Sequence, residues 1–145
     1  MRYLTEPFAL AALRRGRPVE QFLGPVHAAG RLGVHYVEVR PRQGMFEVFL
    51  HTVEDVGHET FLDLAEFPPL STGTEQEEFG RLVTTADDPL SALEAAEHIT
   101  GAVRQRWVNA TMSQVEYADF VLAGRPRRSS PDGHPWPAFM AQPGL

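Results

Sequence analysis

The stretch that most constrains the fold is residues 45–70, because it holds two apolar segments separated by a polar turn. Residues 45–53 alternate between apolar and other side chains, which is the pattern of a half-buried strand. Residues 59–66 alternate in the same way and end before Pro68-Pro69, which cannot donate to a β-ladder. The stretch therefore predicts two strands joined by a turn at residues 54–57.

Residues 32–40 predict a further strand, with apolar side chains on both of its faces. One face carries Val34 and Tyr36, and the other carries His35, Val37 and Val39. Residues 41–44 place proline early and glycine late, as in a tight turn, so this strand is expected to pair with residues 45–53 as an antiparallel hairpin. Residues 81–84 fit a short fourth strand. Consecutive strands with short turns predict a β-meander.

Three segments have the start and stop signals of helices. A helix is expected to begin at residues 5–7, with a hydroxyl cap and an early proline, and to end at Gly16. Another should begin at residues 87–89 and end at Gly101, and a third should span residues 111–122. The secondary structure of two segments is ambiguous from the sequence. Residues 21–26 fit either a brief helix or the approach to the first strand, and residues 103–109 fit a turn or a short helix.

The fold class that follows is α+β. We expect one domain over residues 1–124, with an N-terminal helix, an antiparallel meander of three to five strands, and two or three C-terminal helices covering one face. Residues 125–145 contain many prolines and predict an extended tail, in which Trp136 and Phe139 could dock on the domain. The expected core residues are Phe46, Val48, Leu50, Leu62, Leu64, Leu90, Leu93, Trp107 and Val115.

Composition excludes several classes of site. The chain has no cysteine, which rules out disulfides, zinc–thiolate centres and thiol catalysis. No run approaches the roughly 18 apolar residues that a membrane-spanning helix needs. The apolar run at residues 8–13 is followed by its arginines, whereas a signal peptide has them first. We therefore expect a cytoplasmic protein that is not embedded in a membrane.

Charge is distributed unevenly along the chain. Residues 44–98 carry thirteen acidic residues against the single Arg81, whereas residues 1–43 carry seven arginines against three glutamates. An acidic surface repels phosphate, so nucleic acid is not an expected partner. A basic protein is the expected partner, bound through these carboxylates. The alternative is that the acidic surface serves only to keep the protein soluble. The candidate partner-binding residues are Glu47, Glu54, Asp55, Glu59, Asp63 and Glu66.

No catalytic motif stands out. His51 and His58 flank the turn at residues 54–57 and could approach each other, but their spacing matches no metal-binding motif. The serines lie outside the Gly-x-Ser-x-Gly context of hydrolases, and no glycine-rich phosphate loop is present. We therefore predict no enzymatic activity, no metal and no cofactor, with a metal-dependent hydrolase using His51 and His58 as the least favoured reading.

Four runs of sequence carry a resemblance: residues 59–70, 85–96, 106–109 and 116–120. With these runs the chain resembles small acidic α+β proteins of GC-rich bacteria, similar to the immunity proteins that neutralise polymorphic or contact-dependent toxins. The resemblance implies a non-enzymatic protein that binds a basic toxin domain and blocks it. The alternative is a structural or assembly subunit, phage- or secretion-related, whose tail at residues 125–145 grips a neighbour.

Overall fold

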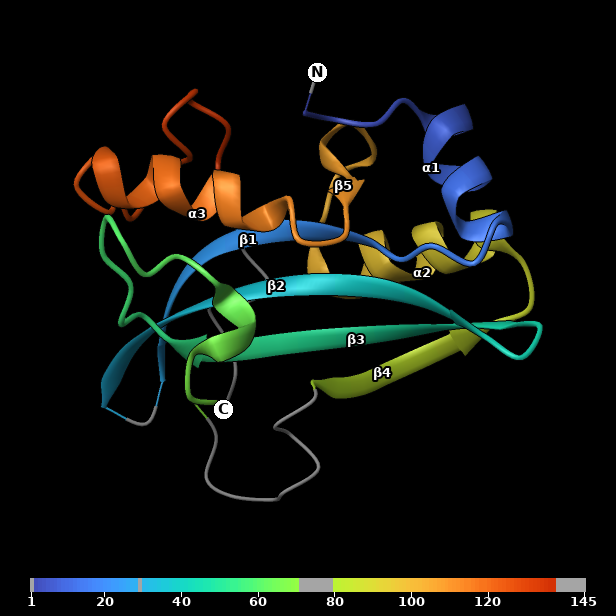
Figure 1. The fold of residues 1–145 in the computed structure, drawn as a ribbon, viewed down its shortest axis with the longest axis horizontal. Helices are drawn as coiled ribbons and strands as arrows, with labels where there is room; N and C mark the ends of the chain where they lie inside the picture. The colour runs from blue at the N-terminus through green and yellow to red at the C-terminus, as the bar shows by residue number, and fades with distance from the viewer. Residues whose placement is uncertain (1, 29, 71–79, 138–145) are drawn as a thin grey trace.

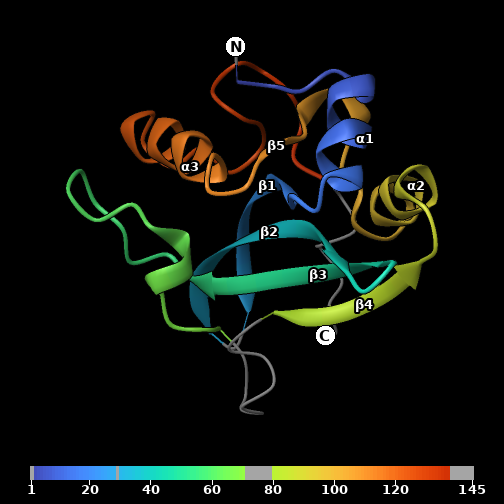
Figure 2. The ribbon, with the colours of Figure 1, turned by 45° about the vertical axis from the view of Figure 1, so that its right-hand side comes forward.

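The computed structural model describes residues 2–28, 30–70 and 80–137, and in them the chain forms one antiparallel sheet with helices on both faces (Figures 1 and 2). The strand order is β4-β3-β2-β1-β5, so β1 to β4 form an up-and-down meander and β5 pairs with the outer edge of β1. The strands are β1 (Val19–Ala28), β2 (Arg31–Arg42), β3 (Met45–Glu54), β4 (Arg81–Ala86) and β5 (Val108–Asn109). The predicted α+β fold with an antiparallel meander is confirmed.

The helices are α1 (Glu6–Arg14), α2 (Pro89–Thr100) and α3 (Ser113–Leu122), with short 3-10 turns η1 (Leu64–Glu66) and η3 (Arg104–Arg106). Residues of α1 and α2 pack with one face of the sheet, and residues of α3 and η1 pack with the other (Figure 2). The expectation that the C-terminal helices cover a single face is therefore wrong, because α2 and α3 bury their apolar residues against opposite faces. Both faces of β2 are therefore covered, which explains why apolar side chains occur on both of its faces between Val34 and Val39. Within the described residues, no helix is both long and apolar enough to cross a membrane.

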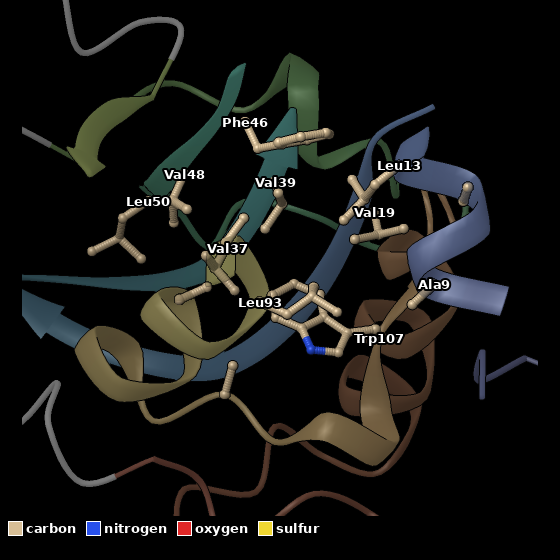
Figure 3. Packing of buried hydrophobic residues seen from close by; sticks show 14 of the residues in the cluster. Ala9, Leu13, Val19, Val37, Val39, Phe46, Val48, Leu50, Leu93 and Trp107 are labelled. Atoms are coloured by element: carbon tan, nitrogen blue, oxygen red, sulfur yellow. The ribbon is translucent and has the colours of Figure 1, made fainter. Parts of the chain in front are cut away.

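The first core lies between the sheet and the pair α1 and α2 (Figure 3). Val37 and Val39 of β2 meet Leu93 of α2 there, and all three are fully buried. Trp107, also fully buried, joins this cluster, and its indole N–H donates to Glu97 Oε2 at 3.0 Å. Burying a large apolar side chain contributes about 1.5–3 kcal/mol, so this cluster is a main source of stability.

The second core lies on the opposite face and is mostly aromatic. Phe22 of β1 meets Tyr117 and Phe120 of α3 with ring centroids 6.0 and 5.7 Å apart. Trp136 adds an edge-on contact to Phe22 at 5.6 Å, and its indole N–H donates to the carbonyl of Pro126 at 3.0 Å. The prediction that Trp136 docks on the domain is confirmed, whereas Phe139 lies outside the described residues.

The indole of Trp136 lies directly against the backbone of Gly24, where β1 carries a bulge. A Cβ atom at this position would overlap the indole ring, and the backbone has a φ of 94°, which side chains rarely adopt. Glycine is therefore required at this point in the strand. This contact ties the described part of the tail to the centre of the sheet.

One predicted strand is wrong. Residues 59–66 form no strand: the isolated bridge between His58 and Phe61 closes a turn, and the following residues form η1. The Asp63 side chain accepts a hydrogen bond from the backbone N–H of Ala65, which favours a turn over an extended ladder. The neighbour of β3 is instead β4, and Pro69 makes only a single bridge to Val53 near the end of β3.

The structure also gives the secondary structure of the two ambiguous segments and corrects three of the predicted core residues. Residues 21–26 belong to the long strand β1, and residues 103–109 hold η3 and β5. Leu90 and Val115 were predicted in the core but are 38% and 36% exposed, because α2 and α3 turn other residues inward, and Leu62 is only half-buried. The other six are buried: Phe46, Val48, Leu50, Leu64, Leu93 and Trp107.

Candidate functional site: a cleft lined by carboxylates

A cleft of about 540 Å³ lies over the sheet face opposite α1 and α2. Its floor is formed by strands β1 to β3, and its walls by residues 63–69 and 110–114. Side chains at alternate positions of a strand share a face, which brings Tyr36, Glu38 and Arg40 of β2 into the cleft together. The register places Glu20 of β1 opposite Glu38, and His51 of β3 opposite Tyr36. Neighbouring strands therefore deliver these polar groups to one place.

Glu20 is 6% exposed and connects the floor to α3. Its Oε1 accepts hydrogen bonds from the backbone N–H and the hydroxyl of Ser113, the first residue of α3. A carboxylate suits this position because the N-terminus of a helix leaves N–H groups without partners and is electropositive. Burial raises the pKa of Glu20, and the charge of Glu38 adds to the rise, while the Ser113 hydrogen bonds oppose it.

Glu38 lies at the centre of a charged group. Its Oε1 is 2.8 Å from Arg40 Nη2 and 2.9 Å from His51 Nε2. Burial alone raises the pKa of Glu38, but the hydrogen bonds and charges of His51 and Arg40 outweigh it and lower the pKa to about 2. The guanidinium of Arg40 also covers the ring of Phe49 at 4.2 Å. The negative charge of Glu38 is thus compensated within the protein.

His51 is held firmly in the floor. Its imidazole stacks on the ring of Tyr36, with centroids 4.4 Å apart and planes within 5°. The backbone of Gly80 approaches the same imidazole so closely that a Cβ atom there would lie 2.6 Å from Cε1. The ring is therefore confined by an aromatic neighbour and a glycine, and it holds Glu38 in place.

Tyr36 shows how the negative charges converge. Burial raises the pKa of Tyr36, and the charges of Glu20, Glu38 and Asp63 each raise it further. Asp63 lies in the wall at residues 63–69, and its Oδ1 accepts a hydrogen bond from Nε2 of Gln114, in the other wall, at 3.1 Å. Among residues 2–28, 30–70 and 80–137, neither Glu20 nor Asp63 forms an ion pair with arginine or histidine. The cleft therefore carries an excess of negative charge.

Comparison with family models, with curated proteins and with solved structures finds no match.

Three of the six predicted binding carboxylates form ion pairs within the protein. Glu47 and Glu54 lie beside arginines of the neighbouring strand β2. Asp55 has a side chain that is only 2% exposed, and it lies 2.9 Å from Arg125 Nε. It also accepts a hydrogen bond from the hydroxyl of Tyr117 at 2.5 Å. Asp55 therefore fixes the turn after β3 to α3 and to the start of the tail.

The other three predicted carboxylates lie on one wall or just before it. Asp63 lines the cleft, Glu66 is exposed on the same wall, and Glu59 is exposed in the turn that precedes it. His51 lies in the floor, whereas His58 lies in the turn after β3, with its Nδ1 3.2 Å from the hydroxyl of Thr60. In the described part of the chain, no three side chains of His, Asp or Glu converge closely enough to hold a metal ion.

Four cleft residues were not among the candidates predicted from the sequence: Glu20, Tyr36, Glu38 and Arg40. A signal was present for three of them, because residues 36, 38 and 40 alternate on a strand that the sequence predicts. Polar residues that alternate along a strand otherwise buried on both faces indicate a polar site. No sequence signal indicated Glu20, because residues 21–26, which follow it, fitted either a helix or a strand.

Acidification is expected to remove the stabilisation that Glu38 provides. The folded-state pKa of Glu38 is about 2, below its ordinary value of 4.5, so the unfolded state binds this proton more readily. The contribution is therefore present above about pH 4.5 and is lost as the pH falls towards 2. Urea unfolding at pH 3 and pH 6 should show a larger loss for the native protein than for Glu38→Gln.

Glu20 provides the matched comparison, because its pKa is shifted in the opposite direction. Its raised pKa contributes stability below the ordinary value, and that contribution is lost as the pH rises through the folded-state pKa. Glu20→Gln should therefore lose more than the native protein between pH 6 and pH 3. Equal pH slopes for the native protein and both variants would contradict this account.

Proposed function

We propose that the chain is a non-enzymatic protein-binding module whose partner presents a basic surface to the cleft and its acidic wall. The observation that carries this proposal is the excess of carboxylates there. Glu20 and Asp63 have no cationic partner among the described residues. Glu66, in the wall at residues 63–69, and Glu59, in the turn before it, are exposed. Complementary charge across an interface accelerates association and selects the partner.

The class of partner that fits is a toxin domain, with this chain as its immunity protein. The support is the resemblance in the four sequence runs above, together with the acidic character of the cleft. A basic toxin that acts on nucleic acid must itself carry positive charge to bind phosphate, and an acidic cleft competes for that surface. The proposal includes a cytoplasmic location and excludes direct binding of nucleic acid by this face.

The assembly-subunit alternative depends on a tail that is free to grip a neighbour. Residues 125–137 instead contact the domain itself, through Arg125 at Asp55 and through Trp136 at Phe22. This favours the binding module. Deleting residues 138–145 removes none of the described contacts, and it should leave capture of the partner unchanged; loss of a large assembly on deletion would instead favour the alternative.

The test is capture from the native host by the immobilised protein at low and at high salt. We expect a basic partner that is released by salt, because screening shortens the reach of exposed charges. The double variant Glu59→Gln/Glu66→Gln should bind this partner about tenfold more weakly, since it removes two charges at the wall.

The matched control is Asp87→Asn/Glu94→Gln. It removes the same charge from exposed positions before and on α2, which lies on the opposite side of the sheet. It should bind as the native protein does. If both double variants weaken capture equally, net charge and not this surface is responsible, and the proposal fails. It also fails if the captured partner is acidic or is retained at high salt.

A further inference from the structure

We infer that the cleft is a receptor for a single guanidinium group, so that the partner inserts one arginine side chain into it. This inference rests on the proposed function and names the group that the partner presents. It is carried by the shape of the cleft, by the carboxylates that converge in it, and by the kinds of donor that these carboxylates lack.

The shape favours an organic group over an ion. A cleft of about 540 Å³ lies within the range of about 300–1,000 Å³ that is typical of sites for small organic groups. It is lined by apolar side chains, including Val53, Leu64 and Phe67, as well as by the polar groups of the floor. In the described residues no metal-binding trio exists. The site therefore fits a ligand with both an apolar stem and a polar end, as arginine has.

The charges favour a cation. Glu20, Glu38 and Asp63 line the same cleft as Tyr36, and the register sets Glu20 directly opposite Glu38. The charges of all three raise the pKa of the Tyr36 phenol. Glu38 is satisfied by Arg40 and His51. Glu20 and Asp63 instead accept hydrogen bonds from neutral donors: Ser113 to one, and Ala65 and Gln114 to the other. A cation bound in the cleft would compensate the negative charges of these two carboxylates.

The number of acceptors favours guanidinium over ammonium. Glu20 in the floor, Asp63 in a wall and the Tyr36 hydroxyl offer acceptors from different elements of the same cleft. Guanidinium carries five N–H donors in a rigid planar fork, whereas an ammonium carries three donors around one point. Arg40 already shows this chemistry beside the site, where it binds Glu38 through two nitrogens. An inserted arginine would repeat that arrangement with Glu20 and Asp63.

The test is an NMR titration of the native protein at low salt with N-acetyl-arginine amide. The comparison ligand is N-acetyl-citrulline amide, which has nearly the same shape but no charge. We expect saturable shifts of the backbone amides of Ala65, Ser113 and Gln114 with the arginine ligand, and at least tenfold weaker binding of the citrulline ligand. Equal binding of the two ligands, no saturable shift, or shifts that map elsewhere would overturn the inference.

Two variants then locate the site. Asp63→Asn and Glu20→Gln each keep a hydrogen-bond acceptor while removing a charge, and each should weaken the arginine ligand at least tenfold. The exposed Glu94→Gln should leave its binding unchanged. Because Glu20 also caps α3, Asp63→Asn decides the outcome if Glu20→Gln fails to fold. Unchanged affinity in Asp63→Asn would place the ligand outside the cleft.

The outcomes separate this inference from the proposed function. If a basic partner is captured and is sensitive to Glu59→Gln/Glu66→Gln, but the arginine ligand does not bind, the inference fails and the proposed function stands. If the arginine ligand binds in the cleft but capture yields no basic partner, the guanidinium site stands and the protein-binding function fails.

Discussion

Replacing Trp107 by alanine is expected to lower the free energy of unfolding by about 3–5 kcal/mol, the usual cost of truncating a large buried aromatic side chain. Trp107 is fully buried in the first core, in one cluster with Leu93 of α2 and Ala9 of α1. The substitution removes the indole from between these elements and takes one N–H donor, at 3.0 Å, from Glu97, which keeps its hydrogen bonds from Arg104. A cavity and a lost hydrogen bond therefore add to the same loss.

Urea unfolding followed by circular dichroism measures this effect without depending on tryptophan fluorescence. The control is Leu122→Ala, because Leu122 is 72% exposed at the end of α3 and should cost less than about 0.5 kcal/mol. A loss for Trp107→Ala no greater than that of Leu122→Ala would show that the first core does not depend on the indole.

Replacing Arg125 by alanine is expected to cost about 2–3 kcal/mol. Breaking a buried ion pair on one side costs about 3–5 kcal/mol, and the smaller figure applies because the Arg125 side chain is 35% exposed. The loss arises at Asp55, whose side chain is 2% exposed and would lose the guanidinium that faces it. Arg125 also donates to the carbonyl of Gly57 at 2.7 Å, which would lose its partner.

The control for this prediction is Arg127→Ala, an exposed arginine two residues further along the tail. It should change the free energy of unfolding by less than about 0.5 kcal/mol. A double-mutant cycle with Asp55→Asn isolates the pair, because Asp55→Asn/Arg125→Ala should cost less than the sum of its two parts. Additive losses would mean that Asp55 and Arg125 act independently.

The sequence predicted the elements whose signals are local. Alternation over β2 and β3 and the turn between them predicted the central hairpin, and early prolines predicted the starts of α1 and α2. The side chain of Asp88 caps α2, whereas Thr5 precedes α1 without a side-chain cap hydrogen bond. The assignment of Val34 and Tyr36 to one face of β2, and of Val37 and Val39 to the other, is confirmed, because side-chain direction in a strand follows from position alone.

The predicted strand at residues 59–66 shows where this reasoning fails. Its alternation is real, but Asp63 forms a local cap to Ala65, and Phe61 and Phe67 turn towards the aromatic cluster around Tyr117. An alternating segment becomes a strand only where a neighbouring strand is free to pair with it. The edge of β3 is taken by β4, a contact between segments about thirty residues apart.

What the sequence alone determined about this protein is its α+β class, the hairpin at its centre and the acidity of its middle third, because each depends on nearest neighbours or on composition. Only the tertiary structure decided which carboxylates meet. Register placed Glu20 opposite Glu38 from distant positions, and the packing of the wall brought Asp63 towards Tyr36. The same packing enclosed Asp55 with Arg125, which the sequence had placed on the surface. Sites of this kind are fixed by contacts between remote segments, which no local pattern records.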